Sequence, residues 1–326
     1  MPILLSEQDI RIVLSMDDLI TTMQTALIRY SAGAVDQPLR TVIEVGLQKA
    51  FFGVMPAFIP DPPSLGAKLV TVFGSNHAVG LPSHQATIIL LDAMTGELVA
   101  VMDGRYITEA RTAAVSAVSV RRLARENAAT LALIGSGVQA RSHLEAIGHV
   151  RRLGAVRVWS PNEERRAAFV SEMRPGTNAP IHDCGSAREA VEGADIIVLA
   201  TASREPVVQS AWVADGAHIC AVGACRPDQR EMDPALVKRG RLFVDSRSAA
   251  LAEAGDVVLA MKEGLFGEDH IAGELGALAA GAIPGRTSPS EVTIFKSLGM
   301  AVEDVAAAHR AYVRAAERGL GRGFVL

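Results

Sequence analysis

The sequence predicts an α/β protein in which a Rossmann-type, doubly wound parallel sheet is joined to a second, α+β domain. Three observations predict this class. Short apolar strands alternate with helical stretches from about residue 130 onward, a pattern typical of parallel sheets. β-rich segments separated by turn residues fill most of the first hundred residues, which indicates an antiparallel sheet. The 326 residues also suffice for about two domains of ordinary size.

The elements of the first domain follow from the periodicity of its apolar residues. Residues 6–31 predict one helix, because Ser6 can cap its start and apolar residues recur at helical spacing. A hairpin is expected from residues 39–46 and 51–55, and the prolines within 60–63 indicate a loop. Further strands are expected at 66–73, 86–92 and 97–102.

The second domain is expected to alternate strands with helices. A helix rich in small residues is predicted over 105–124, and a long helix over 299–318 follows the last strand. Parallel strands are expected at 130–134, 155–159, 195–200, 217–223 and 241–245. Intervening helices are expected at 138–150, 163–174 and 186–192.

The composition disfavours several classes of protein. Hydrophobic residues make up 49% and charged residues 21%, so the chain can bury a core. A net charge of −4 and only 4% aromatic residues argue against nucleic-acid binding. The three cysteines form no C-x-x-C pair, so we expect no disulfide framework and no metal site. The start lacks a signal-peptide pattern and no run of 18 apolar residues occurs, which predicts a cytoplasmic protein without a membrane partner.

The expected strand 130–134 runs directly into a glycine-rich turn. The turn reads Gly135-Ser136-Gly137-Val138-Gln139-Ala140. This is the G-x-G-x-x-A form of the dinucleotide-binding motif, and it lies between a strand and a helix as the motif requires. Gly135 would permit the tight turn, and Gly137 would let a pyrophosphate approach the backbone. We therefore predict a dinucleotide site here, with an ordinary glycine turn as the alternative.

The tip of the next expected strand, 155–159, indicates which dinucleotide is bound. An acidic residue there would bind the ribose hydroxyls of NAD, but the chain has Ser160 and Asn162, with Arg165 close by. These side chains favour a 2′-phosphate, so we predict NADPH as the preferred cofactor and NADH as a possible one. In the alternative interpretations, Glu163 or Glu164 supplies the acid, or Arg165 and the adjacent Arg166 belong merely to a solvated helix face.

Two further stretches are expected at the carboxyl edge of the parallel sheet, where a dinucleotide crosses it. They are Ala200, Thr201 and Ala202, and Val222, Gly223 and Ala224. In the first domain, Lys68 lies within the apolar strand segment 66–73. A lysine in such surroundings either has a buried partner or function, or faces water from an edge strand.

Several distinctive short sequences occur along the chain outside the glycine-rich turn. They are VMPA at 54–57, KLVT at 68–71, PSHQAT at 82–87, VMDG at 101–104, RTAAVSA at 111–117, VGA at 222–224, RPD at 226–228 and FKSLGMAVED at 295–304. Together with the glycine-rich turn, they resemble the ornithine cyclodeaminase/mu-crystallin family, and within it the mu-crystallin-type ketimine reductases. The resemblance covers nearly the whole chain.

The resemblance implies a particular domain organisation. Residues 1–120, joined by the C-terminal helix at 299–326, would form a substrate-binding and dimerisation domain. Residues 121–298 would form the Rossmann domain. The active site would lie in the cleft between the two domains, and the protein would be a homodimer.

The resemblance also implies roles for individual side chains. Lys68 would act at the substrate, and Arg40 and Arg111 would hold its carboxylate, a task that suits the planar guanidinium fork. Positions near the cofactor would be taken by Ser83, His84, Arg111, Thr112, Ser297 and Leu298.

Residue 225 departs from the family pattern. Ornithine cyclodeaminases and related alanine dehydrogenases carry a catalytic aspartate there, within Gly-x-Asp-x-Pro-Gly-Lys, whereas this chain has Cys225. We interpret this cysteine as structural, because hydride transfer to an imine requires no covalent intermediate. Asp228 is then a second candidate catalytic group beside Lys68, and Arg226 is a further candidate for carboxylate binding.

The resemblance, together with these residues, implies an NAD(P)H-dependent reductase of imines derived from 2-oxo acids. Suitable substrates are the cyclic ketimines Δ1-pyrroline-2-carboxylate and Δ1-piperideine-2-carboxylate, which would give L-proline and L-pipecolate. The alternatives within enzymes are an ornithine cyclodeaminase and an alanine or N-alkyl amino-acid dehydrogenase. An alternative of another class is a non-catalytic protein that binds NADPH and a small ligand. The retained Arg40, Lys68, Arg111 and Asp228 favour an enzyme.

Overall fold

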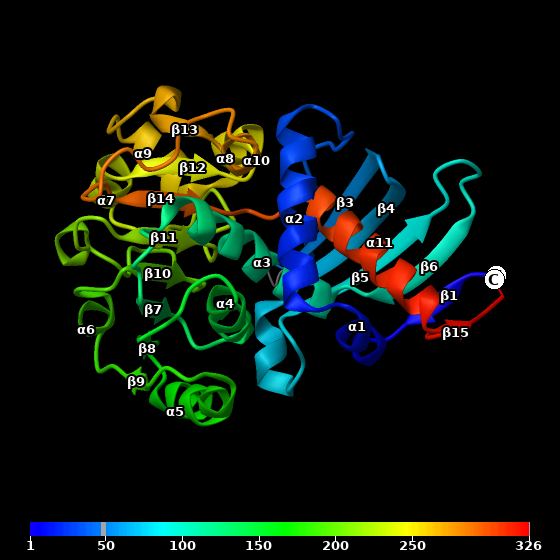
Figure 1. Ribbon diagram of the computed structural model, residues 1–326, viewed down its shortest axis with the longest axis horizontal. Coiled ribbons are helices and arrows are strands. Elements are labelled where there is room, and N and C mark those ends of the chain that lie inside the picture. Colours follow the sequence, from blue (N-terminus) through cyan, green and yellow to red (C-terminus); the bar gives the residue numbers. More distant parts are fainter. Residues whose placement is uncertain (47–49, 326) are drawn as a thin grey trace. The chain divides into compact units, whose positions relative to one another are not determined.

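The computed structural model describes residues 1–46 and 50–325, which form two compact units (Figure 1). Unit 1 consists of Met1–Arg111 and Met300–Leu326, and unit 2 of Thr112–Gly299. The first division falls inside helix α3 (Arg105–Leu123), and so does residue 120, where the family resemblance implies that the first domain ends. A continuous helix gives no sequence signal at such a point, because its caps lie elsewhere.

Unit 1 combines a seven-stranded sheet with helices. Its elements before α3 are β1 (Ile3–Leu5), α1 (Glu7–Val13), α2 (Met16–Ser31), β2 (Thr41–Val45), β3 (Ala50–Pro60), β4 (Pro63–Val72), η2 (Gly74–Val79), β5 (His84–Leu91) and β6 (Leu98–Asp103). The elements after unit 2 are α11 (Ala301–Glu317) and β15 (Arg322–Gly323). The strand order is β15-β1-β6-β5-β4-β3-β2. The predicted hairpin is present as β2–β3, and its turn at 47–49 lies outside the described residues.

Three expectations for unit 1 were wrong in detail. The single helix predicted over 6–31 is two helices, because Leu14 is extended and the side chain of Ser15 caps α2 by accepting from the Asp18 amide. The loop predicted at the prolines is only a tight connection, since β3 and β4 stay paired up to Pro60 and Pro63. The sheet is mixed rather than antiparallel, because β1 runs parallel to β6.

Helix α11 lies across one face of this sheet, in contact with β3, β4 and β5, and α2 packs against α11 (Figure 1). The alternation along β4 follows from this cover: Ser64, Gly66 and Lys68 are buried, whereas the residues between them are half-buried. Lys68 therefore lies on a covered face of a central strand.

Unit 2 is an eight-stranded parallel sheet with helices. Its elements after α3 are β7 (Thr130–Ile134), α4 (Val138–Gly148), β8 (Ala155–Trp159), α5 (Glu163–Met173), η3 (Arg174–Gly176), β9 (Ile181–Asp183), α6 (Ala187–Val191), β10 (Ile196–Leu199), η4 (Ser210–Trp212), β11 (His218–Ala221), α7 (Pro234–Arg239), β12 (Arg241–Val244), α8 (Arg247–Glu253), α9 (Gly255–Lys262), η5 (Glu268–His270), β13 (Ile271–Glu274), α10 (Leu275–Ala279) and β14 (Thr293–Lys296). The order is β13-β12-β14-β11-β10-β7-β8-β9. From β7 the chain proceeds outward to β9 and then returns to β10 on the other side, which creates a switch point of the kind where Rossmann folds bind ligands.

The sheet of unit 2 is buried on both faces, as the doubly wound prediction requires. Ala132 and Ile134 of β7 belong to a core with α6, α7 and α9. Leu131 and Leu133 face the opposite core, with α4 and α5. Strands β7 and β8 have the predicted bounds, whereas the short strands β9, β13 and β14 were missed. Within the described part of the chain, none of the helices has the length and apolar character that a membrane crossing requires.

Candidate active site and dinucleotide site

The side chain of Lys68 is buried and ion-paired. Its Nζ lies 2.7 Å from Asp304 Oδ2, where Asp304 belongs to the first turn of α11, and only 2% of the lysine side chain is exposed. Nζ also donates a longer hydrogen bond of 3.4 Å to Thr108 Oγ1. The alternative of an edge-strand lysine facing water is therefore wrong, because β4 pairs with β3 and β5 and is covered by α11.

Arg111 of α3 is hydrogen-bonded to the carboxylate of Asp304 as well. Its Nε donates to Asp304 Oδ1 at 2.9 Å, and its Nη1 donates to Glu303 Oε2 at 2.7 Å. Both acidic side chains are fully buried. Lys68, Arg111, Glu303 and Asp304 are called the buried charge cluster below. Sequence reasoning missed the two acids, although adjacent acidic residues at the start of an apolar, alanine-rich helix are a visible signal.

The buried charge cluster shifts the pKa values of its members. Burial lowers the pKa of Lys68, and the charges of Arg111 and Arg40 act in the same direction. The Asp304 charge opposes them, and the resulting pKa is about 8. Burial alone would raise the pKa of Asp304, but the charges of Arg111 and Lys68 outweigh it and hold that pKa below its usual range. Lys68 can therefore release and regain a proton near neutral pH, while Asp304 stays ionised.

His84 begins β5 and is half-buried. Burial, together with the charges of Lys68 and Arg111, lowers its pKa to about 4, so its imidazole is neutral near pH 7. Arg40 is half-buried just before β2, and Ser83 is half-buried before β5. Thr112 follows Arg111 on α3 but belongs to unit 2.

The glycine-rich turn of unit 2 has the geometry that a pyrophosphate needs. Gly135 has φ +123°, and a Cβ there would lie 2.6 Å from the carbonyl oxygen of Ala200, so glycine is required. Gly137 is the N-cap of α4, has no side-chain cap, and faces open space where a Cβ would point. Ala140 is buried against the sheet. A tight turn beside an accessible helix N-terminus fits a bound dinucleotide.

The tip of β8 contributes the side chains expected beside the adenosine ribose. The hydroxyls of Ser136 and Ser160 lie 2.8 Å apart, which joins the glycine-rich turn to this tip. Asn162 caps α5 by accepting from the Arg165 amide at 2.8 Å. Arg165 is exposed, and no hydrogen bond or ion pair of its side chain is found among the described residues. Arg166 is instead committed to Asp183 and to the Ser160 carbonyl.

Two buried carboxylates that the sequence analysis missed hold the predicted strand-end loops. Glu231 accepts hydrogen bonds from Thr201, which follows β10, and from Gly223 and Ala224, which follow β11. Asp245 accepts from the Leu298 amide at 2.5 Å and from the Ser297 hydroxyl at 3.4 Å. The remaining predicted neighbours there are Ala200, half-buried, Ala202, exposed, and Val222, buried.

Asp228 and Arg226 lie together in the loop after β11. Arg226 Nε is 3.3 Å from Asp228 Oδ1, and the aspartate side chain is 46% exposed. Arg230, which the sequence places near Asp228, pairs with Glu263 instead. Cys225 is half-buried, and its thiol donates to the Val222 carbonyl at 3.3 Å. Among the described residues, no three acidic, histidine or cysteine side chains are grouped to hold a metal ion.

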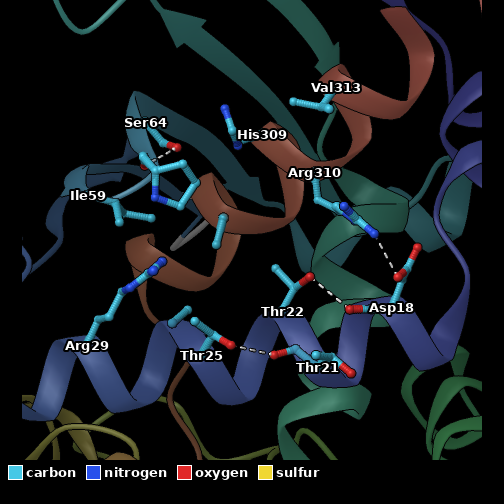
Figure 2. Close-up of a pocket in the computed structure, with 13 residues that line it drawn as sticks. Asp18, Thr21, Thr22, Thr25, Arg29, Ile59, Ser64, His309, Arg310 and Val313 are labelled. Carbon is cyan, nitrogen blue, oxygen red and sulfur yellow. Dashed lines mark hydrogen bonds and ion pairs between the residues drawn. The ribbon is translucent and has the colours of Figure 1, made fainter. Parts of the chain in front are cut away.

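A separate pocket of about 410 Å³ in unit 1 lies among α2, the β3–β4 hairpin and α11 (Figure 2). The two arginines that line this pocket are paired with carboxylates: Arg310 lies 2.8 Å from Asp18, and Arg29 lies 3.0 Å from Asp61. None of the described residues that line it was predicted for the site.

A sequence model of the ornithine cyclodeaminase/mu-crystallin family matches residues 1–319. The chain belongs to this family. A relative within the family, ketimine reductase mu-crystallin from Mus musculus, is 43% identical over 297 residues, which covers 90% of this chain and 91% of the relative. The family resemblance inferred from the sequence motifs is thereby confirmed.

Two solved structures are similar to this chain over nearly its whole length. Δ1-pyrroline-2-carboxylate reductase from Thermococcus litoralis, in complex with NADH and L-proline, has a TM-score of 0.97 and 39% identity, covering 99% of this chain and 100% of that one. An archaeal alanine dehydrogenase dimer with bound NAD has a TM-score of 0.93 and 32% identity, covering 99% of both chains. The predicted fold class, a Rossmann sheet plus an α+β domain, is confirmed.

Proposed function

We propose that this protein is an NAD(P)H-dependent reductase of cyclic ketimines, acting on Δ1-pyrroline-2-carboxylate or Δ1-piperideine-2-carboxylate to give L-proline or L-pipecolate. The buried charge cluster carries this proposal, because it places a lysine of pKa about 8 beside a guanidinium group. The names of the similar proteins, a ketimine reductase and a Δ1-pyrroline-2-carboxylate reductase, support it.

The residues of unit 1 suit the binding of an imine that carries one carboxylate. Lys68 and Arg111 pair with Asp304 and Glu303, and the charge of Arg40 also acts on Lys68, so three basic side chains serve this part of unit 1. Arg40 and Arg111 would bind the substrate carboxylate. A protonated imine accepts a hydride more readily, and protonated Lys68 can keep it protonated. His84 is neutral near pH 7 and does not compete for this role.

The residues of unit 2 would hold the cofactor, which supplies the hydride when bound. The accessible amides at Gly137 and the helix that follows would bind the pyrophosphate. Asp228 remains a candidate second acid, but its exposure and its pairing with Arg226 favour Lys68 as the proton donor. Arg226 remains a candidate for the substrate carboxylate.

We propose that NADPH binds more tightly than NADH. The tip of β8 carries no acid at Ser160, and Arg165 stands exposed at the start of α5 where a 2′-phosphate can reach it. Arg165→Ala should weaken NADPH binding and leave NADH binding unchanged in a fluorescence titration. Ser160→Asp should move the preference toward NADH. A wild-type preference for NADH would contradict the proposal and point to Glu163 or Glu164 as the ribose ligand.

We also propose a homodimer that forms through β2. This strand is the outer edge of its sheet, and its apolar Val42, Ile43 and Val45 are 49%, 56% and 37% exposed. An apolar edge strand with unpaired backbone groups is a template for strand pairing with a second copy. The similar alanine dehydrogenase is described as a dimer.

One panel of assays tests the reaction. Oxidation of NADPH and NADH is followed with both cyclic ketimines and with pyruvate plus ammonia or methylamine, and ammonia release is followed with L-ornithine. We expect turnover of at least one cyclic ketimine and little or no ammonia release from ornithine, because Cys225 replaces the family's aspartate. Efficient turnover of ornithine would establish a cyclodeaminase, and preferred turnover of pyruvate would establish an alanine or N-alkyl amino-acid dehydrogenase. Cofactor binding with no turnover in the whole panel would indicate a binding protein. Cys225→Asp is the single change expected to raise ornithine turnover.

A further inference from the structure

Glu231 joins two strand-end loops of unit 2 through four hydrogen bonds. Its Oε1 accepts from the amide of Thr201 at 2.6 Å and from the hydroxyl of Thr201 at 2.8 Å. Its Oε2 accepts from the amides of Gly223 and Ala224 at 2.7 and 3.0 Å. The carboxylate is fully buried, so water does not replace these bonds. One side chain thus links the backbone that follows β10 to the backbone that follows β11.

The backbone of Glu231 is itself held in place. Asp256 Oδ1 accepts from the amides of Glu231 and Met232 at 2.8 and 3.0 Å. Asp256 Oδ2 lies 3.3 Å from Nζ of Lys296, the last residue of β14, and both side chains are fully buried. The support for Glu231 therefore extends to a third strand of the same sheet edge.

The packing around Glu231 leaves no room for adjustment. A Cβ on Gly223 would overlap the carbonyl oxygen of Thr201. A Cβ on Gly255, beside Asp256, would overlap the carbonyl of Gln229 and lie 2.6 Å from that of Arg226. The loop that leads from Gly223 to Glu231 is therefore pinned at both ends, and a change at Glu231 moves the loops it connects.

We infer that Glu231 is a positioning residue for the cofactor site, which holds the backbone after β10 and β11 in the conformation that binds the dinucleotide. This inference rests on the proposed function. A dinucleotide binds at the carboxyl edge of a Rossmann sheet, where β10 and β11 end, and the Glu231 side chain joins the backbone that follows these two strands. A carboxylate is needed, because an amide would turn a donor toward one of the two loops, both of which present donors.

The test is the affinity for NADH and NADPH of Glu231→Gln, measured by fluorescence titration of the full-length protein. We expect the dissociation constants of both cofactors to rise about ten-fold or more, since a buried donor loses its acceptor. The maximal rate at saturating cofactor should change much less. Glu231→Asp keeps the charge with a shorter reach, so it should be intermediate, and it serves as the variant should Glu231→Gln fail to fold.

Asp195→Asn is the matched control. Asp195 accepts from the amides of Ala129 and Thr130 at 2.9 and 3.0 Å and pairs with Arg125, but at the opposite, amino-terminal edge of the same sheet. Its loss should lower the thermal stability and leave both cofactor affinities unchanged.

Unchanged cofactor affinity in a folded Glu231→Gln or Glu231→Asp variant would overturn the inference. An equal loss of affinity in Asp195→Asn would also overturn it, because the effect would then follow stability alone. Failure of the wild-type protein to bind either cofactor would overturn the proposed function instead, and this inference with it.

Discussion

Replacing Asp304 by asparagine should move the pH dependence of the reaction. The carboxylate lies 2.7 Å from the Lys68 ammonium and is fully buried, so it raises the lysine pKa that burial lowers. A unit charge about 4 Å away contributes about 4 kcal/mol at an effective dielectric constant of about 20, equivalent to roughly three pKa units. Because asparagine still offers an oxygen to the ammonium, we expect the pKa of Lys68 to fall by roughly one to three units from its value of about 8.

The sign of the effect follows from the role of Lys68 as proton donor. The protonated fraction of the lysine falls as the pH rises through its pKa, so kcat/KM of the wild-type protein should decline above about pH 8. In Asp304→Asn the same decline should occur at lower pH, and activity at pH 8 should be mostly lost. The assay is NADPH oxidation with a cyclic ketimine between pH 5 and pH 10.

Two comparisons make this prediction refutable. Asp304→Glu retains the negative charge, so its pH profile should return toward that of the wild type. Asp18→Asn removes a carboxylate from a partly exposed pair with Arg310 in the same unit, and should leave the profile unchanged. Urea unfolding should show a loss of about 3–5 kcal/mol for Asp304→Asn, since one member of a buried pair is left behind. A folded Asp304→Asn variant with the wild-type pH profile would refute the assignment of the donor to Lys68.

Three further outcomes are expected. Arg111→Ala should raise the KM for the imine by a factor that corresponds to about 1.5–3 kcal/mol, with little change in cofactor affinity; an equal loss of cofactor affinity would assign the arginine to the cofactor. Gly135→Ala should lower the melting temperature, because φ is +123° and a backbone carbonyl blocks the added Cβ, whereas Gly137→Ala should melt like the wild type and bind the cofactor more weakly. Ile43→Lys should convert the dimer to a monomer in light scattering, and Val79→Lys, at an even more exposed apolar position outside the edge strand, should not; an unchanged mass for Ile43→Lys would exclude the β2 edge.

The sequence predicted most of the parallel sheet because strands such as β7, β8 and β10 are short runs in which apolar residues predominate. The bounds of β7 and β8 follow directly from such runs. β14 was missed because its four residues end in a lysine, and only the buried partner Asp256 explains how Lys296 is tolerated there.

The candidate site was predicted only in part. Lys68 and the glycine-rich turn stand out locally, because a lysine in an apolar strand and a G-x-G-x-x-A run are visible without a structure. Asp304 is visible only as one of two adjacent acids at the start of an apolar helix, and Glu231 has no such signal. The role of each depends on partners that the fold brings together. Asp304 meets Arg111 across 193 positions of sequence, and Glu231 meets Thr201 across 30.

The discontinuous course of unit 1 sets an order of events during synthesis. Unit 2 is one uninterrupted stretch that ends at Gly299, so all its strands leave the ribosome before α11 does. Until α11 emerges, Lys68 and Arg111 have neither Asp304 nor Glu303, and the face of β3, β4 and β5 that α11 covers is exposed. Unit 1 is therefore the last part to be completed, and a nascent chain truncated before residue 300 carries an unpaired lysine and arginine on an uncovered apolar sheet. We expect such a chain to bind chaperones that recognise exposed apolar surface. Once α11 folds onto β3, β4 and β5, that surface is covered and the chaperone is no longer needed.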